Sequence, residues 1–126
     1  MFYGLKNPKK VSEILTKLNE GKISLSYAAE EFWSFLAEFY EQAPEILAQI
    51  RPEITYKLIR AALSSADLDM FRLAEKNIWF REKVGSVIRS LSKEELEEVS
   101  KAILRSGLDR SAIASRIFYR YKKLRK

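Results

Sequence analysis

The apolar residues of this chain recur every three or four positions along most of its length, with no run in which they alternate with polar residues. A spacing of three and four places side chains on one face of an α-helix, whereas a half-buried strand shows strict alternation. Glycine and proline, which number four and three, stand at the interruptions of this spacing. The pattern therefore predicts an all-α fold, a compact multi-helix bundle of six or seven helices joined by short loops.

Residues that cap or break helices mark the expected helix ends. Ser92 and Glu95 form a capping-box sequence, and Asp109 is expected to cap the last helix. Asn77 and Gly85 are the points at which a long helix is expected to bend. We expect helices over about residues 8–20, 25–43, 52–64, 68–90, 93–106 and 109–124, with a short helix or a bent connection over 45–51.

The length of 126 residues, 47% of them apolar, suits a single helical domain over residues 1–126 with a substantial core. The longest stretch without a charge, residues 23–29, is far too short for a transmembrane span. The chain has no cysteine and begins without an apolar leader, so we expect a cytoplasmic protein. Many charges and only five Asn and Gln residues fit a thermophile, although small helical proteins of mesophiles share this composition.

The residue types that enzymes use are scarce or scattered. Without histidine or cysteine the chain lacks the commonest general base and the commonest ligands of zinc, and its four glycines form no phosphate loop. Asp67 and Asp69 could help to bind Mg²⁺, but they stand at a helix start, where capping is the better interpretation. The glutamates within 94–98 are likewise interpreted as a solvated helix start. We therefore expect a non-enzyme with no catalytic residue, no metal site and no cofactor.

The most informative functional feature is the separation of charge along a chain whose net charge is +6. Residues 27–56 hold six acidic side chains and one basic one, whereas residues 105–126 hold eight basic and one acidic. Cations neutralise phosphates and an interleaved aromatic ring stacks on bases, so a basic last helix, about 109–124, suits DNA or RNA. The expected nucleic-acid-binding residues, most of them on the arc away from the apolar stripe, are Arg110, Arg116, Tyr119, Arg120, Lys122, Lys123 and Lys126.

Other interpretations of the C-terminal region stay open. Residues 93–124 have the outline of a helix-turn-helix, but Ile103, Ser106 and Arg116 are not the residue types this motif prefers at their positions, which favours an ordinary helical hairpin. The basic residues also suit a soluble helix end, because cations there complement the helix dipole. A helix lying on a membrane surface is the weakest option, since the apolar side is modest and contains Arg125.

The aromatic-rich helix expected over 25–43 suggests a different role. Its apolar arc is wide for a surface helix. The helix is therefore either the central helix of the core or one that contributes part of its apolar arc to a subunit interface. In the second case Trp33 and Tyr40 are the expected interface residues, and the protein is expected to be a homodimer.

The sequence thus predicts a small non-enzymatic basic helical protein that binds DNA or RNA non-specifically, or that is an accessory subunit of a nucleic-acid-processing complex. The alternative is a structural or protein–protein interaction module, of a viral or archaeal kind, that self-associates through its aromatic-rich helix.

Overall fold

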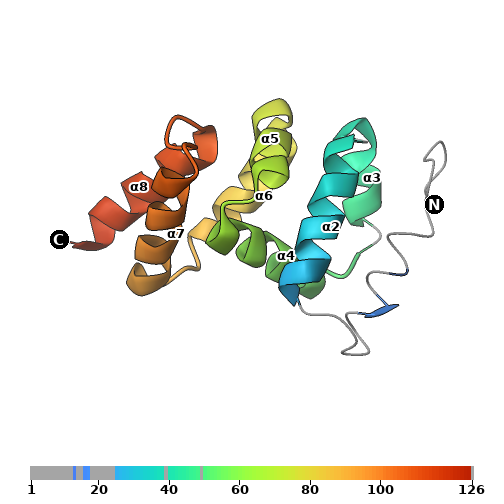
Figure 1. The fold of residues 1–126 in the computed structure, drawn as a ribbon, viewed down its shortest axis with the longest axis horizontal. Helices are drawn as coiled ribbons and strands as arrows, with labels where there is room; N and C mark the ends of the chain where they lie inside the picture. Colours follow the sequence, from blue (N-terminus) through green and yellow to red (C-terminus); the bar gives the residue numbers. More distant parts are fainter. Residues whose placement is uncertain (1–12, 14–15, 18–24, 39, 49, 126) are drawn as a thin grey trace.

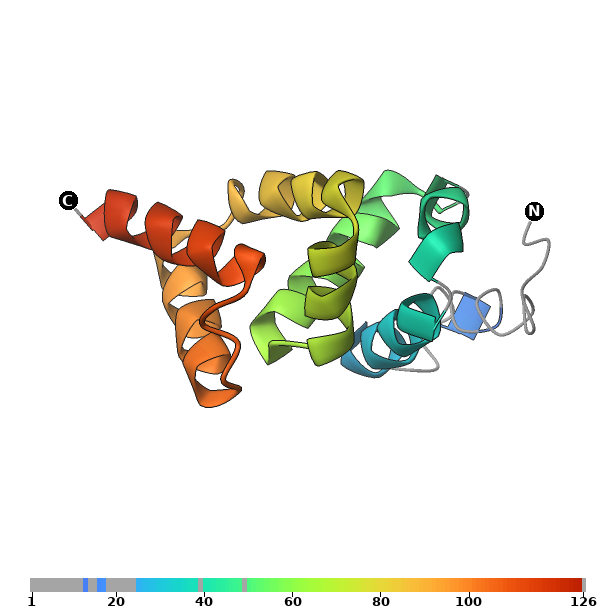
Figure 2. The same cartoon turned by 90° about the horizontal axis from the view of Figure 1, so that it is seen from above.

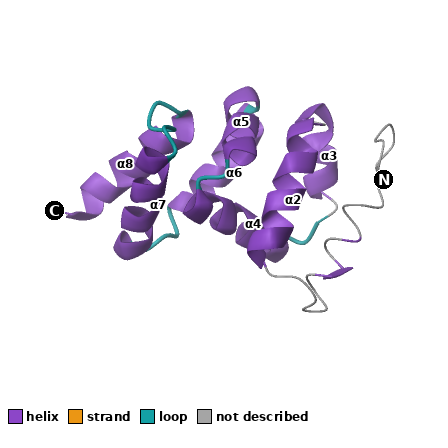
Figure 3. Ribbon diagram, viewed as in Figure 1, coloured by secondary structure: helices purple, strands orange, loops and turns teal. Residues whose placement is uncertain are grey.

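Helices account for nearly all of the described chain, which comprises residues 13, 16–17, 25–38, 40–48 and 50–125 of a computed structural model (Figure 1). The helices are α2 (Leu25–Glu38), η1, a 3-10 turn (Tyr40–Gln42), α3 (Ala43–Ala48), α4 (Pro52–Ser65), α5 (Leu68–Lys76), α6 (Ile78–Ile88), α7 (Lys93–Arg105) and α8 (Ala112–Arg125). No strand occurs in these ranges (Figure 3), which confirms the all-α prediction. Of the helix expected over 8–20, residues 13 and 16–17 are helical, and the rest lies outside the described residues.

The helices follow one another along the long axis of the molecule, from α2 and α3 at one end to α7 and α8 at the other (Figures 1 and 2). The main packing partners of α2 are α4 and α5, and those of α8 are α5, α6 and α7. Buried side chains of all these helices join in one continuous apolar core. This arrangement places the acidic N-terminal part and the basic C-terminal part of the described chain far apart.

The centre of the core near α2 is built around Trp33, which is fully buried. Its ring packs against Phe32 and Phe80 at centroid distances of 5.1 and 5.3 Å. Its indole Nε1–H donates a 3.1 Å hydrogen bond to the carbonyl oxygen of Leu58. A large ring buried with its only donor satisfied contributes several kcal/mol, on the order of 3, to folding, so α2 is the central core helix at this end.

One continuous helix over 68–90 is wrong, because the chain breaks into α5 and α6 at Asn77, one of the two expected bend points, while α6 continues through the other, Gly85. Asn77 is extended (φ −135°, ψ 105°), and its side-chain oxygen accepts from the backbone N–H of Phe80, so it caps α6. Arg81 reaches back to the end of α5 and donates to the carbonyl oxygens of Ala74 and Glu75 at 2.9 and 2.8 Å. Both helix ends at the break are thus satisfied by side chains.

The expected helix over 25–43 is also too long, since α2 ends at Glu38 and α3 starts at Ala43. Pro44 follows as the second residue of α3, in the first turn, where its missing N–H leaves no helix bond unmade. Pro52 opens α4 in the same way. The segment expected over 45–51 is therefore a short helix that begins two residues earlier than predicted.

The predicted caps are confirmed at two helices and wrong at the last one. The side chain of Asp67 accepts from Met70 N at the start of α5, and Ser92 with Glu95 forms the complete capping box of α7. Asp109, in contrast, is exposed in the turn before α8. The connection between α7 and α8 spans six residues, 106–111, which is longer than the turn of a helix-turn-helix and agrees with an ordinary hairpin.

Two other side chains take the role expected of Asp109. The hydroxyl of Ser111 accepts from the N–H of Ala114, and a carboxylate oxygen of Glu75, on α5, accepts from the N–H of Ala112. The helix α8 begins at Ala112, three residues later than expected, where Glu75 of α5 supplies a carboxylate acceptor for the first backbone N–H.

Candidate nucleic-acid interface

Three side chains at the end of α8 form what we call the basic surface: Tyr119, Lys122 and Lys123. All three are exposed, and Tyr119 is 67% exposed, an unusual extent for an aromatic ring. The ammonium of Lys123 lies 5.5 Å from the centroid of the Tyr119 ring, one helical turn away. An accessible ring thus stands beside one ammonium group, and Lys122, three residues after Tyr119, lies on the same side of the helix. Arg110 is exposed at the opposite end of α8, and Lys126 lies outside the described residues.

Arg116 and Arg120 are less exposed than these three residues, although 37% of the Arg116 side chain is still accessible. Both are partly enclosed against α6, because α8 packs on α6 as well as on α7 and the flanks of its apolar stripe are covered. Arg116 Nη2 lies 3.5 Å from a carboxylate oxygen of Glu82, and Arg120 Nη2 donates to the carbonyl oxygen of Arg89 at 3.5 Å. We call Arg89, Arg116 and Arg120 the α6–α8 seam.

Arg89 was not foreseen as a site residue. It ends a stripe on α6, Ile78, Glu82, Gly85 and Arg89, whose spacing of four, three and four puts all four on one face. That spacing is visible in the sequence, but it also fits a plain solvated face. In the structure this face of α6 packs against α8, where Glu82 contacts Arg116 and the Arg89 carbonyl accepts from Arg120.

The proposed interface residues Trp33 and Tyr40 differ in the structure. Trp33 has no exposed surface, so its assignment to a subunit interface is wrong; the core of this same chain covers it. Tyr40 is 37% exposed, and the ammonium of Lys76 lies 4.7 Å from its ring centroid. The homodimer stays a prediction that has lost its main structural reason.

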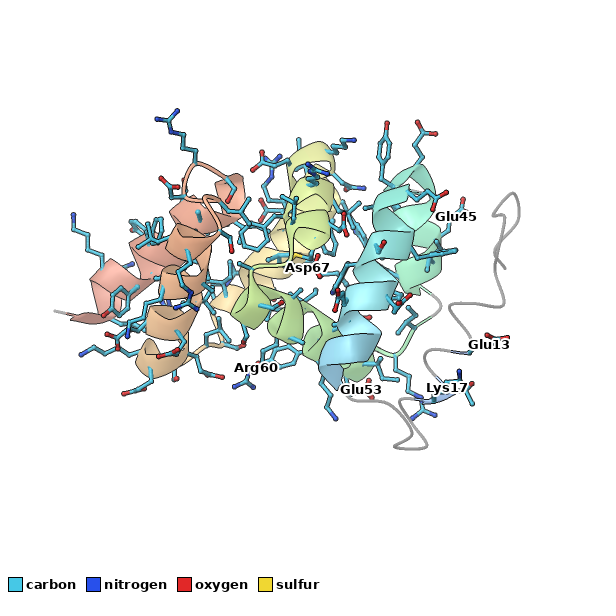
Figure 4. All side chains as sticks on the ribbon, viewed as in Figure 1. Glu13, Lys17, Glu45, Glu53, Arg60 and Asp67 are labelled. Atoms are coloured by element: carbon cyan, nitrogen blue, oxygen red, sulfur yellow. The ribbon has the colours of Figure 1, made fainter. Side chains whose placement is uncertain are left out.

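Acidic groups gather at the end of the molecule opposite α8, where Glu45 on α3 is labelled in Figure 4. Nearer the centre, Asp67, Asp69 and Glu30 line one shallow pocket of about 400 Å³. Burial raises the pKa of Asp67, the neighbouring carboxylates add to the rise, and the hydrogen bond from Met70 N opposes it. No cluster of metal-ligating side chains occurs in the part of the chain that the structure describes.

The glutamates at the start of α7 have partners within the fold. Glu95 closes the capping box through a 2.9 Å bond from Ser92 N, and it also forms an ion pair with Arg60 on α4. Glu98 lies 3.9 Å from Lys101, one turn away. The interpretation of this run as a helix start rather than a metal site agrees with these contacts.

Comparisons of the chain with protein-family models, with curated proteins and with solved structures gave no match. Within the described ranges, no helix is both long enough and apolar enough to cross a membrane.

Proposed function

We propose that this protein binds single-stranded nucleic acid without sequence preference, as a non-enzymatic binding protein or as an accessory subunit of a nucleic-acid-processing complex. The observation that carries the proposal is the exposed ring of Tyr119 beside Lys122 and Lys123 on α8. An accessible ring can stack on an unpaired base, while the two ammonium groups neutralise flanking phosphates. Neither contact reads the edge of a base, so sequence preference is not expected.

The charge around this surface supports the same function. From Arg110 to the end of the chain no acidic residue occurs, so the helix offers its cations no carboxylate partner of its own. The acidic residues of α2 and α3 lie at the end of the molecule opposite α8 (Figure 1). A polyanion approaching α8 is therefore not repelled by α2 and α3, and the acidic side chains of the neighbouring helix are the exposed Glu94, Glu97 and Glu98 of α7.

The test is the binding of fluorescently labelled oligonucleotides, followed by anisotropy at about 50 mM salt. We expect wild type to bind a single-stranded oligothymidine more tightly than a duplex of equal length, and to release it as salt rises. Lys122→Glu with Lys123→Glu should abolish binding. The matched control is Lys57→Glu with Arg72→Glu, which makes the same charge change at exposed positions of α4 and α5.

Two outcomes would refute the proposal. One is the absence of any shift with wild type on single-stranded DNA or RNA. The other is an equal loss of binding in the control, because binding would then depend on net charge rather than on the basic surface.

A second candidate function is head-to-tail self-association. The observation that favours it is the position of the exposed acidic residues Glu38, Glu41 and Glu45 at the end of the molecule opposite α8 (Figures 1 and 4). Contact between unlike ends joins copies head to tail, which gives an open chain of copies unless the rotation between them closes a ring. Light scattering at low salt would then show a mass that grows with concentration, and the Lys122→Glu, Lys123→Glu variant would stay small.

A further inference from the structure

The seam between α6 and α8 brings together guanidinium groups that have few partners. Gly85, buried in the middle of α6, provides the space they occupy. A Cβ at Gly85 would lie 3.7 Å from Arg116 Nε and 3.8 Å from Arg89 Nη1, so the two guanidinium groups both lie against Gly85. Arg120, one helical turn beyond Arg116, donates one long hydrogen bond to the carbonyl oxygen of Arg89.

The charge of this seam is poorly balanced. Glu82 is the carboxylate that contacts it, through a single 3.5 Å approach to Arg116, and the Glu82 side chain is 65% exposed. An exposed ion pair of that length contributes little. Three guanidiniums with one weakly engaged carboxylate leave a concentrated positive charge, which costs free energy unless an anion joins it.

The hydrogen-bond donors of the seam are also incompletely used. Arg116 makes two long bonds, at 3.4 Å to the Ala112 carbonyl and at 3.5 Å to Glu82, and the Arg120 bond is also 3.5 Å. The Nε–H of Arg120 is buried and has no acceptor among the described residues. A buried donor without an acceptor is destabilising. A guanidinium held so loosely can turn toward an anion entering beside Arg89, which is exposed.

We infer that the α6–α8 seam binds one phosphate group, with Arg89 and Arg116 as its direct ligands and Arg120 beside them. Phosphate is the fitting anion because its oxygens accept paired N–H bonds from guanidiniums. One group is expected because the guanidiniums of Arg89 and Arg116 both lie over the same residue, Gly85. The inference rests on the proposed function in one respect: the phosphate is taken to be part of a nucleic-acid backbone that also crosses the basic surface.

The first experiment measures how many phosphates each group of side chains neutralises. In Arg89→Gln with Arg116→Gln, the salt dependence of oligothymidine binding should fall by about 0.7 in log–log slope, as expected for one phosphate on a single strand. The matched control, Lys122→Gln with Lys123→Gln, removes the same charge from separate exposed positions. It should lower the slope by about 1.4, as expected for two phosphates.

The second experiment uses inorganic phosphate and pyrophosphate alone. Either anion should raise the melting temperature of wild type and of the lysine variant above that in sodium chloride of equal ionic strength, and should not do so for the arginine variant. If the arginine double variant melts early by itself, Arg89→Gln alone, at an exposed position, serves in its place and should weaken the same effect.

The two experiments separate the inference from the proposed function. An arginine variant with wild-type salt slope and wild-type response to phosphate would overturn the seam site, even if the lysine variant confirms nucleic-acid binding. Stabilisation by pyrophosphate without any oligonucleotide binding would support the seam as a phosphate site and overturn the proposed function. The source of the phosphate would then be a free phosphorylated compound.

Discussion

Replacing Gly85 by alanine tests the packing of the α6–α8 seam. Gly85 lies inside α6, where a glycine is about 0.8–1.0 kcal/mol less favourable than alanine. The added methyl group would meet its nearest neighbours at 3.7–3.8 Å, which is ordinary van der Waals contact. Since the site is buried, the methyl group adds up to about 0.8 kcal/mol of apolar burial. Gly85→Ala should therefore raise the free energy of unfolding by about 1–2 kcal/mol.

Gly107 gives the matched control, because the same substitution should have the opposite sign there. Gly107 has φ +71°, in the left-handed region, and a Cβ would have open space around it. That backbone conformation costs alanine about 1 kcal/mol or more in free energy, and the added methyl group makes no new contact. Gly107→Ala should thus be destabilising by about that amount.

Urea unfolding followed by circular dichroism measures both changes. An increase for Gly85→Ala beside a decrease for Gly107→Ala would agree with the reasoning. A Gly85→Ala protein that unfolds more easily than wild type would refute it, since the guanidiniums of Arg89 and Arg116 would then pack closer to the α6 backbone than described.

Three further changes can be measured by thermal melting. Ile117→Asp should cost about 3 kcal/mol or more, because Ile117 is fully buried and an unpaired carboxylate would replace it, whereas Tyr119→Asp on the same helix should melt nearly as wild type does. Ser92→Ala should cost about 1 kcal/mol by removing the cap of α7; an unchanged melt would mean that the capping box contributes nothing. Asp67→Asn keeps an oxygen for the cap and removes a charge whose folded pKa is raised above its ordinary value of 3.8. Because the folded pKa is raised, the wild-type protein has its full stability below about pH 3.8 and loses part of it as the pH rises through the folded pKa. The melting temperature of Asp67→Asn should therefore be higher than that of wild type at neutral pH, and the two should become equal in acid.

Most helices of this fold could be predicted from the sequence, because each of them buries one stripe of apolar residues. The caps at Asp67 and Ser92 were also predictable, since an acceptor side chain bonding three residues ahead is a local matter. At Asn77 the sequence predicted only a bend within one long helix, and not a break between two helices. The apolar spacing continues through it, and what separates α5 from α6 is the extended Asn77 together with Arg81 bonding back to α5.

The candidate site was less predictable than the fold. Periodicity distinguishes an apolar stripe from a polar arc, but it does not say which second helix will cover the edge of that arc. Arg116 and Arg120 are partly enclosed beside α6, whereas Tyr119 and Lys123, which helical spacing places on the same broad arc, stay exposed. Trp33 failed as an interface residue for a related reason, since the wide aromatic arc of α2 is covered by α4 and α5.

The order of the helices along one axis limits how the two ends of the molecule can influence each other. The main neighbours of α2 and of α8 have one helix in common, α5. Through Glu75, that helix also holds the first N–H of α8. Any energetic coupling between the acidic end and the basic end therefore has its shortest packed route through α5, a helix of nine residues. An event on α8 that does not shift the last turn of α5 reaches the opposite end by longer packed routes, through α6 or α7 and then α4.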